Sequence, residues 1–429
     1  MPPNVKFSHL NISGWRQFEK IELELHDKLT VITGANGAGK STLLNIFSGH
    51  FNYLRPLLAT PRADKSGGYK YFSGVISYIS KALFTHNVAN THEIVGEIRY
   101  SNGKSSPIRV PATNGISYNL DIDNKLPLSG FHVSSHRRLP HYQQVNHIPT
   151  HAMAPEDAYN HFDGEMRTSY QGGNTNFSST YRIKEALLSM ALLGTKTEFN
   201  EGNAVLRETF SGFSDTLKNI LPEEIGFIEI SIRSPDVVLV TKTGEFLIDA
   251  VSGGLLALID LAWQIYMYSV HHESFVVTID EPENHLHPSM QRLLMGNLIK
   301  TFPNVQFIVA SHSPFIISAV RDARVYVLRH GDRPDLVAEN AINPKQTRFV
   351  SSICLDSVNR AGTASQILRD VLGLETTYPE WVSDGVDAII NRYRGRMFDD
   401  ALMRDLRSDL KNAGYGDLLP DVTSVLAKQ

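Results

Sequence analysis

The sequence has little of what marks secreted, membrane-bound or broadly nucleic-acid-binding proteins. Its 429 residues include one cysteine, Cys354, which excludes a disulfide framework or a cysteine-rich zinc site within the chain and favours a reducing compartment. Lysine and arginine number 41 against 45 acidic residues, so the net charge of −4 provides no general attraction to nucleic acid or anionic membranes. The first residues lack the basic and then apolar profile of a secretion signal. We therefore expect a cytoplasmic protein.

Long apolar runs, internal repeats and low-complexity segments are also missing. The most apolar stretch, 255–270, is interrupted by Asp260 and Gln264 and is shorter than the roughly 20 residues that cross a membrane. We interpret it as a buried helix. Hydrophobic residues make up 42% of the chain and charged residues 20%, which is an ordinary globular composition with enough length for two or three domains.

The spacing of the apolar residues predicts an α/β fold. Strands are expected at 5–12, 18–25 and 29–33, followed by a helix at 40–47. After residue 225 strands and helices alternate again, which is typical of a largely parallel sheet covered by helices. The predicted strands in this part are 227–232, 237–241, 246–250, 275–279, 306–310 and 325–328, and the predicted helices are 255–268 and 289–301.

Two other parts of the chain are less regular. The first, residues 51–224, lies between the two α/β parts. It contains a predicted strand meander at 93–133, loops at 146–176 and helices at 182–193 and 204–221. Several prolines and the absence of sustained heptads speak against long coiled-coil arms in this insertion. After residue 340 the pattern is mostly helical, with helices expected at 365–372, 385–393 and 399–412.

A phosphate-binding loop is the sharpest motif in the chain. Residues 34–42 read GANGAGKST, which fits GxxxxGK[ST] between a predicted strand and a predicted helix. Glycines allow successive backbone N–H groups to face an anion, and the start of the helix adds its positive end. Lys40 would contact the β- and γ-phosphates, and Ser41 would bind Mg²⁺. The loop residues expected to contact nucleotide are Asn36, Gly37, Ala38, Gly39, Lys40, Ser41 and Thr42. The alternative, a plain glycine-rich turn, does not account for this context.

Two acids follow the apolar strand at 275–279. Asp280 lies where α/β sheets place their ligands, at the carboxyl end of a strand, and would hold Mg²⁺ opposite Ser41. Glu281 would polarise the attacking water. By itself such a pair is more often a solvated acidic turn. Beside a phosphate loop the functional interpretation is favoured.

Two further polar segments point to phosphate. Ser311, His312 and Ser313 follow the strand at 306–310, where His312 could donate a hydrogen bond to a γ-phosphate, although a lone histidine is commonly structural. Ser252, Gly253 and Gly254 precede the helix at 255–268 and form a second anion-binding helix start, or else an ordinary N-cap. One nucleotide has one triphosphate, so two such sites in one chain need an explanation.

The complete set of motifs resembles the ABC-type ATPases, within them the RecF/SMC/OLD-like branch. The matching stretches are GANGAGKST (34–42), VSGG (251–254), TIDEPENHLHP (278–288) and ASHSP (310–314). The resemblance implies a mostly parallel P-loop sheet with an antiparallel lobe, and a homodimer or higher homo-oligomer that holds ATP and Mg²⁺ between two copies. Ser252 would then touch the γ-phosphate bound to the other copy, His312 would be the switch histidine and Glu281 the catalytic base.

The sequence departs from this family in some positions. Val251 replaces the usual leucine, and the glutamine that couples the γ-phosphate to the second lobe is not clearly placed, with Gln143 or Gln144 as the candidate. The residues after His312 show no strand-borne pair of acids, so the TOPRIM nuclease module of OLD proteins is expected to be absent. We therefore predict an ATPase domain at 1–340, with the insertion at about 51–224, and a helical, partner-binding region at 341–429.

Stand-alone ATPases of this kind resemble the ATPase components of bacterial anti-phage systems such as Septu, PARIS and retron-linked modules. The resemblance implies an ATP-hydrolysing sensor or scaffold that controls a separate nuclease or toxin. A DNA-repair or recombination ATPase acting on DNA is the main alternative. A third alternative, the ATP-binding subunit of a transporter, would need a membrane partner, and the long insertion argues against it. A fourth, a nucleotide-gated scaffold, would show negligible turnover.

Two weaker clusters remain. Five histidines crowd one stretch, and either bind a metal or belong to a polar loop whose Arg137 and Arg138 contact phosphate. They are His132, His136, His141, His147 and His151. Near the C-terminus Arg392, Arg394, Arg396, Arg404 and Arg407 form either a basic face for a partner or DNA, or a solvated face balanced by Asp399, Asp400, Asp405 and Asp409.

Overall fold

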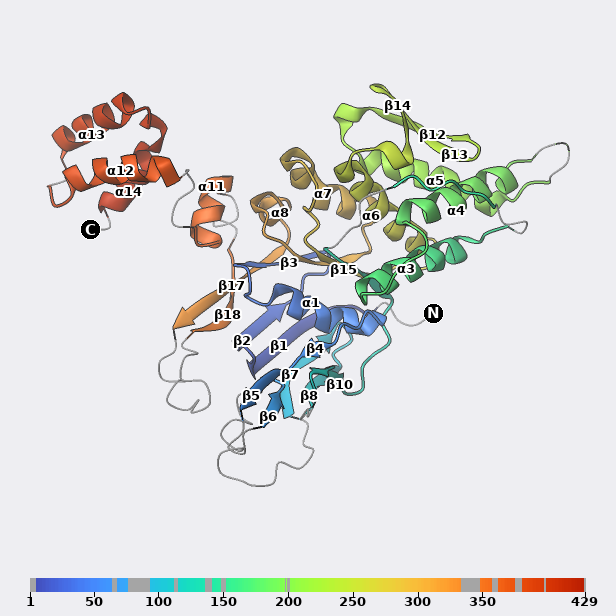
Figure 1. The fold of residues 1–429 in the computed structure, drawn as a ribbon, viewed down its shortest axis with the longest axis horizontal. Helices are drawn as coiled ribbons and strands as arrows, with labels where there is room; N and C mark the ends of the chain where they lie inside the picture. Colours follow the sequence, from blue (N-terminus) through green and yellow to red (C-terminus); the bar gives the residue numbers. More distant parts are fainter. Residues whose placement is uncertain are drawn as a thin grey trace. The chain divides into compact units, whose positions relative to one another are not determined.

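The chain divides into two compact units, Met1–Gly362 and Thr363–Gln429, in a computed structural model (Figure 1). The residues that the structure describes are 5–63, 68–75, 93–111, 115–135, 141–147, 152–196, 198, 201–332, 348–356, 362–374, 380–396 and 399–427.

The first unit is built on a sheet whose eleven described strands lie in the order β10-β8-β7-β1-β2-β18-β17-β3-β16-β15-β11. From β17 to β11 every neighbouring pair is parallel, and from β2 to β10 every neighbouring pair is antiparallel. The strands are β1 (Phe7–Trp15), β2 (Phe18–Glu24), β3 (Leu29–Gly34), β7 (Glu93–Tyr100), β8 (Ser105–Val110), β10 (Asp121–Ile122), β11 (Gly130–Val133), β15 (Val276–Asp280), β16 (Gln306–Ala310), β17 (Arg324–Asp332) and β18 (Arg348–Cys354). The predicted α/β class, a P-loop sheet with an antiparallel lobe, is confirmed.

The central parallel strands are buried on both faces because helices cover them. Every residue of β3 and β16 is buried, in keeping with their continuous apolar sequences. In Figure 1, α1 (Lys40–Ser48) lies on one side of β3 and β15, and α6 (Gly253–Ser269), α7 (Pro288–Thr301) and α8 (Pro314–Ser318) lie on the other. The carboxyl ends of β3, β15 and β16 therefore meet at one edge, where ligands of α/β sheets bind.

The insertion adds helices and small sheets to this unit. α3 (Pro155–Tyr170), α4 (Ser179–Gly194) and α5 (Ala204–Ile220) pack against α6, and α4 and α5 also contact a three-stranded antiparallel sheet. That sheet consists of β12 (Phe227–Arg233), β13 (Asp236–Thr241) and β14 (Gly244–Leu247). The remaining short elements are η1 (Gly49–Phe51), β4 (Leu57–Leu58), β5 (Thr60–Ala63), β6 (Tyr69–Phe72), β9 (Ser117–Tyr118), η2 (Glu223–Ile225) and η3 (Ile248–Ala250).

Some predictions for individual elements were wrong. Helix α3 lies where loops were expected, because its polar, glycine-containing sequence hides a buried stripe formed by Ala158, Tyr159 and Phe162. Strand β18 lies in a region expected to be helical, and it pairs antiparallel with β17 and parallel with β2. The strand expected at 246–250 ends at Leu247 and continues as η3.

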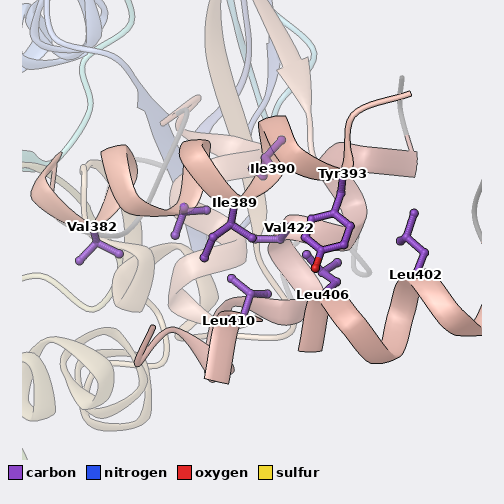
Figure 2. Close-up of a cluster of buried hydrophobic side chains, with 9 residues drawn as sticks. Val382, Ile389, Ile390, Tyr393, Leu402, Leu406, Leu410 and Val422 are labelled. Carbon is purple, nitrogen blue, oxygen red and sulfur yellow. The ribbon is translucent and has the colours of Figure 1, made fainter. Parts of the chain in front are cut away.

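The second unit is a small helical unit with a core of its own, shown in Figure 2. It contains α11 (Ala364–Gln366), η4 (Ile367–Val371), α12 (Glu380–Tyr393), α13 (Asp400–Asn412), η5 (Gly416–Leu418) and α14 (Leu419–Ala427). The side chains of Val386, Leu406 and Leu410 are fully buried between these helices. Helices α12 and α13 agree with the predicted ones, whereas α14 was not predicted. None of the helices in the described ranges of either unit is long and apolar enough to cross a membrane.

Candidate functional site

The loop between β3 and α1 has a backbone that only glycine accommodates. Gly34, Gly37 and Gly39 have φ values of 141°, 78° and 98°. A Cβ atom on Gly34 would lie 2.5 Å from the Leu328 carbonyl oxygen, and one on Gly39 would lie 2.5 Å from Cζ of Phe18. Helix α1 begins at Lys40, as predicted. The loop geometry is therefore that of an anion cradle closed by a helix N-terminus.

The Lys40 side chain lies inside this loop. Its Nζ donates hydrogen bonds to the carbonyl oxygens of Gly34 and Ala35, at 3.0 and 3.1 Å. Burial lowers the pKa of Lys40, and the nearby carboxylates of Glu281, Asp280 and Glu283 partly offset that effect. The ammonium group thus lies within electrostatic reach of the acids that follow β15.

Asp280 ends β15 beside the start of α1, with most of its carboxyl group buried. Burial raises the pKa of Asp280, a hydrogen bond with the Ser41 hydroxyl lowers it, and the charge of Glu281 raises it. Its Oδ1 is buried and has no hydrogen-bond partner among the described residues. A carboxylate oxygen with no partner beside a hydroxyl oxygen is a donor set that suits Mg²⁺. The residues predicted to hold the metal therefore fit it.

Glu281 and His312 come together at the ends of β15 and β16. Glu281 Oε1 lies 3.6 Å from His312 Nε2, and Glu281 Oε2 accepts a hydrogen bond from Asn284 Nδ2 at 3.1 Å. Glu281 has a φ of 49°, an uncommon backbone conformation that turns the chain sharply after the strand. Burial and the charge of Lys40 lower the pKa of His312, although Glu281 and Glu283 oppose the shift. The imidazole is therefore neutral near pH 7.

Glu283 is a residue of this site that sequence reasoning missed. Its Oε1 accepts hydrogen bonds from the Ser311 hydroxyl and from the backbone N–H groups of His312 and Ser313, at 2.8, 2.7 and 3.0 Å. One carboxylate thus ties the loop after β15 to the loop after β16 and fixes the backbone of His312. The signal in the sequence was a third acid in the DEPE stretch, directly after the two that were assigned roles.

A cavity of about 640 Å³ opens beside Ser41 and Asp280. Its other lining residues include Thr42, Arg16, Arg55, His132, Ser134, Ser135 and Tyr170. Ser134 and Ser135 follow β11, and because β11 runs parallel to β15, these serines lie at the same edge of the sheet as Asp280.

The candidate coupling glutamines lie elsewhere. Gln143 does not line the cavity; its side chain donates to the Asn176 carbonyl and accepts from the Ser178 N–H. Gln144 is exposed and does not line the cavity either. Neither glutamine lines this cavity, whereas Ser134 and Ser135 do, and the coupling role of either glutamine stays a prediction.

Ser252 caps α6, its Oγ accepting a hydrogen bond from the Leu255 N–H at 3.4 Å. A Cβ on Gly254 would lie 2.5 Å from the His285 carbonyl oxygen, so the start of α6 packs closely on the loop after β15. A Cβ on Gly253, by contrast, would meet no atom within 4 Å. Ser252 is exposed and is not among the residues that line the cavity. The chain therefore presents a second helix N-terminus apart from the cavity beside its own phosphate loop.

The histidine stretch gives no support for a metal site. His132 is buried on β11 with Nδ1 2.9 Å from the Thr278 hydroxyl, and burial lowers the pKa of His132 to about 3. His141 and His147 are exposed, and His136, His151, Arg137 and Arg138 lie outside the described residues. Within the described residues, no group of three or more histidine, cysteine or acidic side chains could hold a metal ion.

The C-terminal arginines are at least partly balanced by acids. Arg392 pairs with Asp409 at 3.2 Å, and the Arg396 guanidinium lies over the Tyr393 ring at 5.4 Å from its centroid. The pair of Arg392 with Asp409 agrees with a solvated, charge-balanced face at this position.

Two family models match the parts of the chain that carry these motifs. The model described as "AAA domain" matches residues 9–54, which contain the phosphate loop, and the model described as "AAA domain, putative AbiEii toxin, Type IV TA system" matches residues 227–318, which contain the other three motifs.

The chain is also similar to curated proteins. It is 22% identical over 401 residues to the Retron Ec83 probable ATPase of Escherichia coli, a match covering 77% of this chain and 72% of the relative. It is 24% identical over 388 residues to the Retron Vc95 probable ATPase of Vibrio cholerae serotype O1 biovar El Tor, covering 76% and 74%. The Septu protein PtuA of Bacillus thuringiensis is 25% identical over 189 residues, covering 42% and 45%.

Among solved structures, the SMC head domain from Thermotoga maritima is 11% identical with a TM-score of 0.38, and the match covers 82% of this chain and 99% of that one. The sequence matches agree with the motifs and with the observed sheet. The predicted resemblance to retron-linked and Septu proteins is confirmed, and both matching family models are AAA domain models.

Proposed function

We propose that this chain is the ATP-hydrolysing subunit of a cytoplasmic, multi-protein anti-phage complex, in which it senses or scaffolds and controls a separate nuclease or toxin. The observation that carries the ATPase part is the convergence of Lys40, the Ser41–Asp280 pair and the Glu281–His312 pair at one edge of the sheet. The names of the similar retron and Septu proteins support the defence role.

Each residue of the site has a chemical task in this proposal. The N–H groups of the phosphate loop and the Lys40 ammonium would bind and neutralise the β- and γ-phosphates. When bound by Ser41 and Asp280, Mg²⁺ would supply further charge neutralisation on those phosphates. Glu281 would orient the attacking water and accept its proton, and His312, held by Glu283 and Glu281, would donate a hydrogen bond to the γ-phosphate.

The second helix N-terminus completes the site in a homodimer or a larger homo-oligomer. Ser252, Gly253 and Gly254 of one copy would contact the γ-phosphate held by the phosphate loop of another, in an isologous arrangement. The exposure of Ser252 and its separation from the cavity of its own chain support this assignment.

Mixing two inactive variants tests this arrangement. Lys40→Ala should abolish nucleotide binding, and Ser252→Arg should block the contact with a second copy's ATP. A mixture would contain dimers in which one of the two composite sites has both residues intact. With random exchange of subunits, we expect phosphate release to recover to about a quarter of the unmutated rate. A mixture that stays inactive, although its chains exchange, contradicts the arrangement.

The partner part of the proposal has its own test. We propose that the helical region Thr363–Gln429, which forms the second unit, holds the effector. Tagged chain expressed with its neighbouring genes should co-purify with a nuclease or toxin, and removal of that region should release it. Strong, salt-sensitive DNA binding by the chain alone, with no co-purifying protein, would instead favour the DNA-repair alternative.

A further inference from the structure

A buried ion pair lies close to the proposed second anion site. Lys184 of α4 and Asp249 of η3 have side-chain exposures of 0% and 3%, and Nζ lies 2.6 Å from Oδ2. Removing two charges from water is unfavourable unless the pair is closely placed and further hydrogen-bonded. The short distance between Nζ and Oδ2 and the further hydrogen bond of Lys184 to the Gln143 carbonyl meet this condition on the lysine side.

The pair joins two segments of the site. Asp249 lies two residues before Val251, the first residue of the segment at 251–254 that contains Ser252. The same Lys184 Nζ donates a second hydrogen bond, at 2.6 Å, to the backbone carbonyl of Gln143. Gln143 belongs to the stretch that follows β11, whose Ser134 and Ser135 line the cavity beside Asp280. One ammonium group thus joins the backbone at Gln143 to η3, just before the start of α6.

Other contacts of α4 reinforce this bridge. The Gln143 side chain accepts a hydrogen bond from the Ser178 N–H at the start of α4, at 2.8 Å. In the first turn of α4, the Ser179 hydroxyl donates to Oδ2 of Asp260, which lies on α6, at 2.9 Å. The Tyr142 ring lies 4.8 Å from the Lys184 Nζ and covers it. Helix α4 is therefore bonded to the segment around Gln143 and also to α6.

We propose that Lys184 is a positioning residue that holds the 251–254 segment in place for the ATP of a second copy. This inference rests on the proposed function, because it requires Ser252 to act on ATP bound by another copy. It assigns the insertion helix α4 a role in the reaction that none of the four motifs indicates.

The variant that tests this role must avoid an unpaired buried charge. Lys184→Met by itself leaves the Asp249 carboxylate buried without its partner, and such a chain could fail to fold. The double variant Lys184→Met/Asp249→Leu replaces the pair by apolar side chains of similar size and removes the bond to Gln143. Lys218→Met is the matched control, because Lys218 pairs with Asp215 at 3.0 Å on the exposed surface of the neighbouring helix α5.

The expected result is a division between binding and turnover. The double variant should bind a non-hydrolysable ATP analogue with a Kd within about threefold of the unmutated chain, while its phosphate release falls at least about tenfold and its ATP-dependent dimer is depleted. Mixed with Lys40→Ala, it should recover to about a quarter of the unmutated rate, because its own phosphate loop is intact. The control should behave as the unmutated chain.

Three outcomes overturn the inference. Turnover of the double variant equal to that of the control would remove Lys184 from the reaction. A parallel loss of analogue binding would place its effect on its own phosphate loop. The same conclusion, an effect on its own phosphate loop, would follow if the double variant mixed with Lys40→Ala stays inactive while Ser252→Arg mixed with Lys40→Ala recovers. If both mixtures stay inactive, the proposed ATP sandwich itself fails, so the two failures are distinguishable.

Discussion

At the scale of single residues, the site depends on polar groups held in uncommon positions. Glu281 has a positive φ, Asp280 keeps a buried oxygen without a hydrogen-bond partner among the described residues, and Lys40 is bonded to carbonyl oxygens of its own loop. The positive φ of Glu281 and the unpartnered oxygen of Asp280 cost stability in the absence of ligand, as is common where charge is bound or moved. Two substitutions test whether these residues serve the reaction.

Glu281→Gln removes the group that would accept the proton from water and keeps its size. We expect phosphate release to fall by at least about 100-fold, as is typical on losing a general base, with ATP binding retained. The ATP-bound dimer should accumulate, because its formation needs no hydrolysis. Phosphate-release assays and size-exclusion chromatography with ATP measure both effects. Unchanged turnover would remove Glu281 from its proposed role.

Asp280→Asn should separate function from stability. The amide has the shape of the carboxylate but no charge, so a buried anion with an unpartnered oxygen is replaced by a neutral group. We expect the metal-free variant to melt at the same temperature as the unmutated chain or higher, while MgATP no longer raises the Tm and turnover falls by about 100-fold or more. A clearly lower Tm without ligand would show that Asp280 serves the fold instead.

At the scale of elements, buried polar side chains fix how helices and strands meet. Asp163 of α3 accepts hydrogen bonds from Tyr53 and Tyr159 and pairs with Arg167, and this network holds α3 against the segment after α1. Tyr170, at the end of α3, thereby reaches the cavity. Two buried histidines act similarly: His50 bonds to Tyr100 of β7, and His132 of β11 bonds to Thr278 of β15.

These two histidines make the first unit sensitive to acid. Burial lowers the pKa of His50 to about 4 and that of His132 to about 3, below the ordinary value of 6.5. Because the unfolded chain binds these protons more readily, the stability is present above about pH 6.5 and is lost as the pH falls towards the lowered values. At pH 5 we expect a loss of about 2 kcal/mol for each histidine relative to pH 7.5.

Denaturation curves at the two pH values measure this loss. The variant His132→Asn keeps a polar group opposite Thr278 but does not titrate in this range, so it should show about half of the pH-dependent loss. A loss of equal size in the variant and the unmutated chain would show that His132 contributes nothing to the acid sensitivity.

At the scale of the whole molecule, the chain consists of two units with separate cores. The second unit has only a small core, formed by α12, α13 and α14, so each buried side chain contributes a large part of its stability (Figure 2). The first unit carries every residue of the proposed ATP site. Stability of the second unit and turnover by the first should therefore respond to different substitutions.

Leu406→Ala tests this separation. Leu406 is fully buried in the second unit, and truncation should cost that unit about 2–5 kcal/mol. Hydrogen–deuterium exchange should increase across 380–427 and stay unchanged in the strands of the first unit. Phosphate release by the isolated chain should be retained. Faster exchange at β3, β15 and β16 as well would show that the two units unfold together.

Short stretches of the sequence were enough to predict the candidate site residues and the elements that carry them. The phosphate loop, the acids after β15, the histidine after β16 and the serine before α6 are short stretches, in which the required residue types lie next to one another. The continuous apolar runs of β3 and β16 likewise predicted buried parallel strands. Local backbone preferences and side-chain chemistry suffice for such features, because they do not depend on distant parts of the chain.

Contacts between distant residues, by contrast, were known only from the folded structure. Strand β18 is a strand because β17 and β2 lie on both sides of it, and α3 is a helix because its narrow apolar stripe is buried against α6. Glu283 becomes the anchor of His312, and Lys184 the partner of Asp249, through contacts between segments that are far apart in the chain. Burial and long-range hydrogen bonding arise only once the sheet has formed, and no local pattern encodes them.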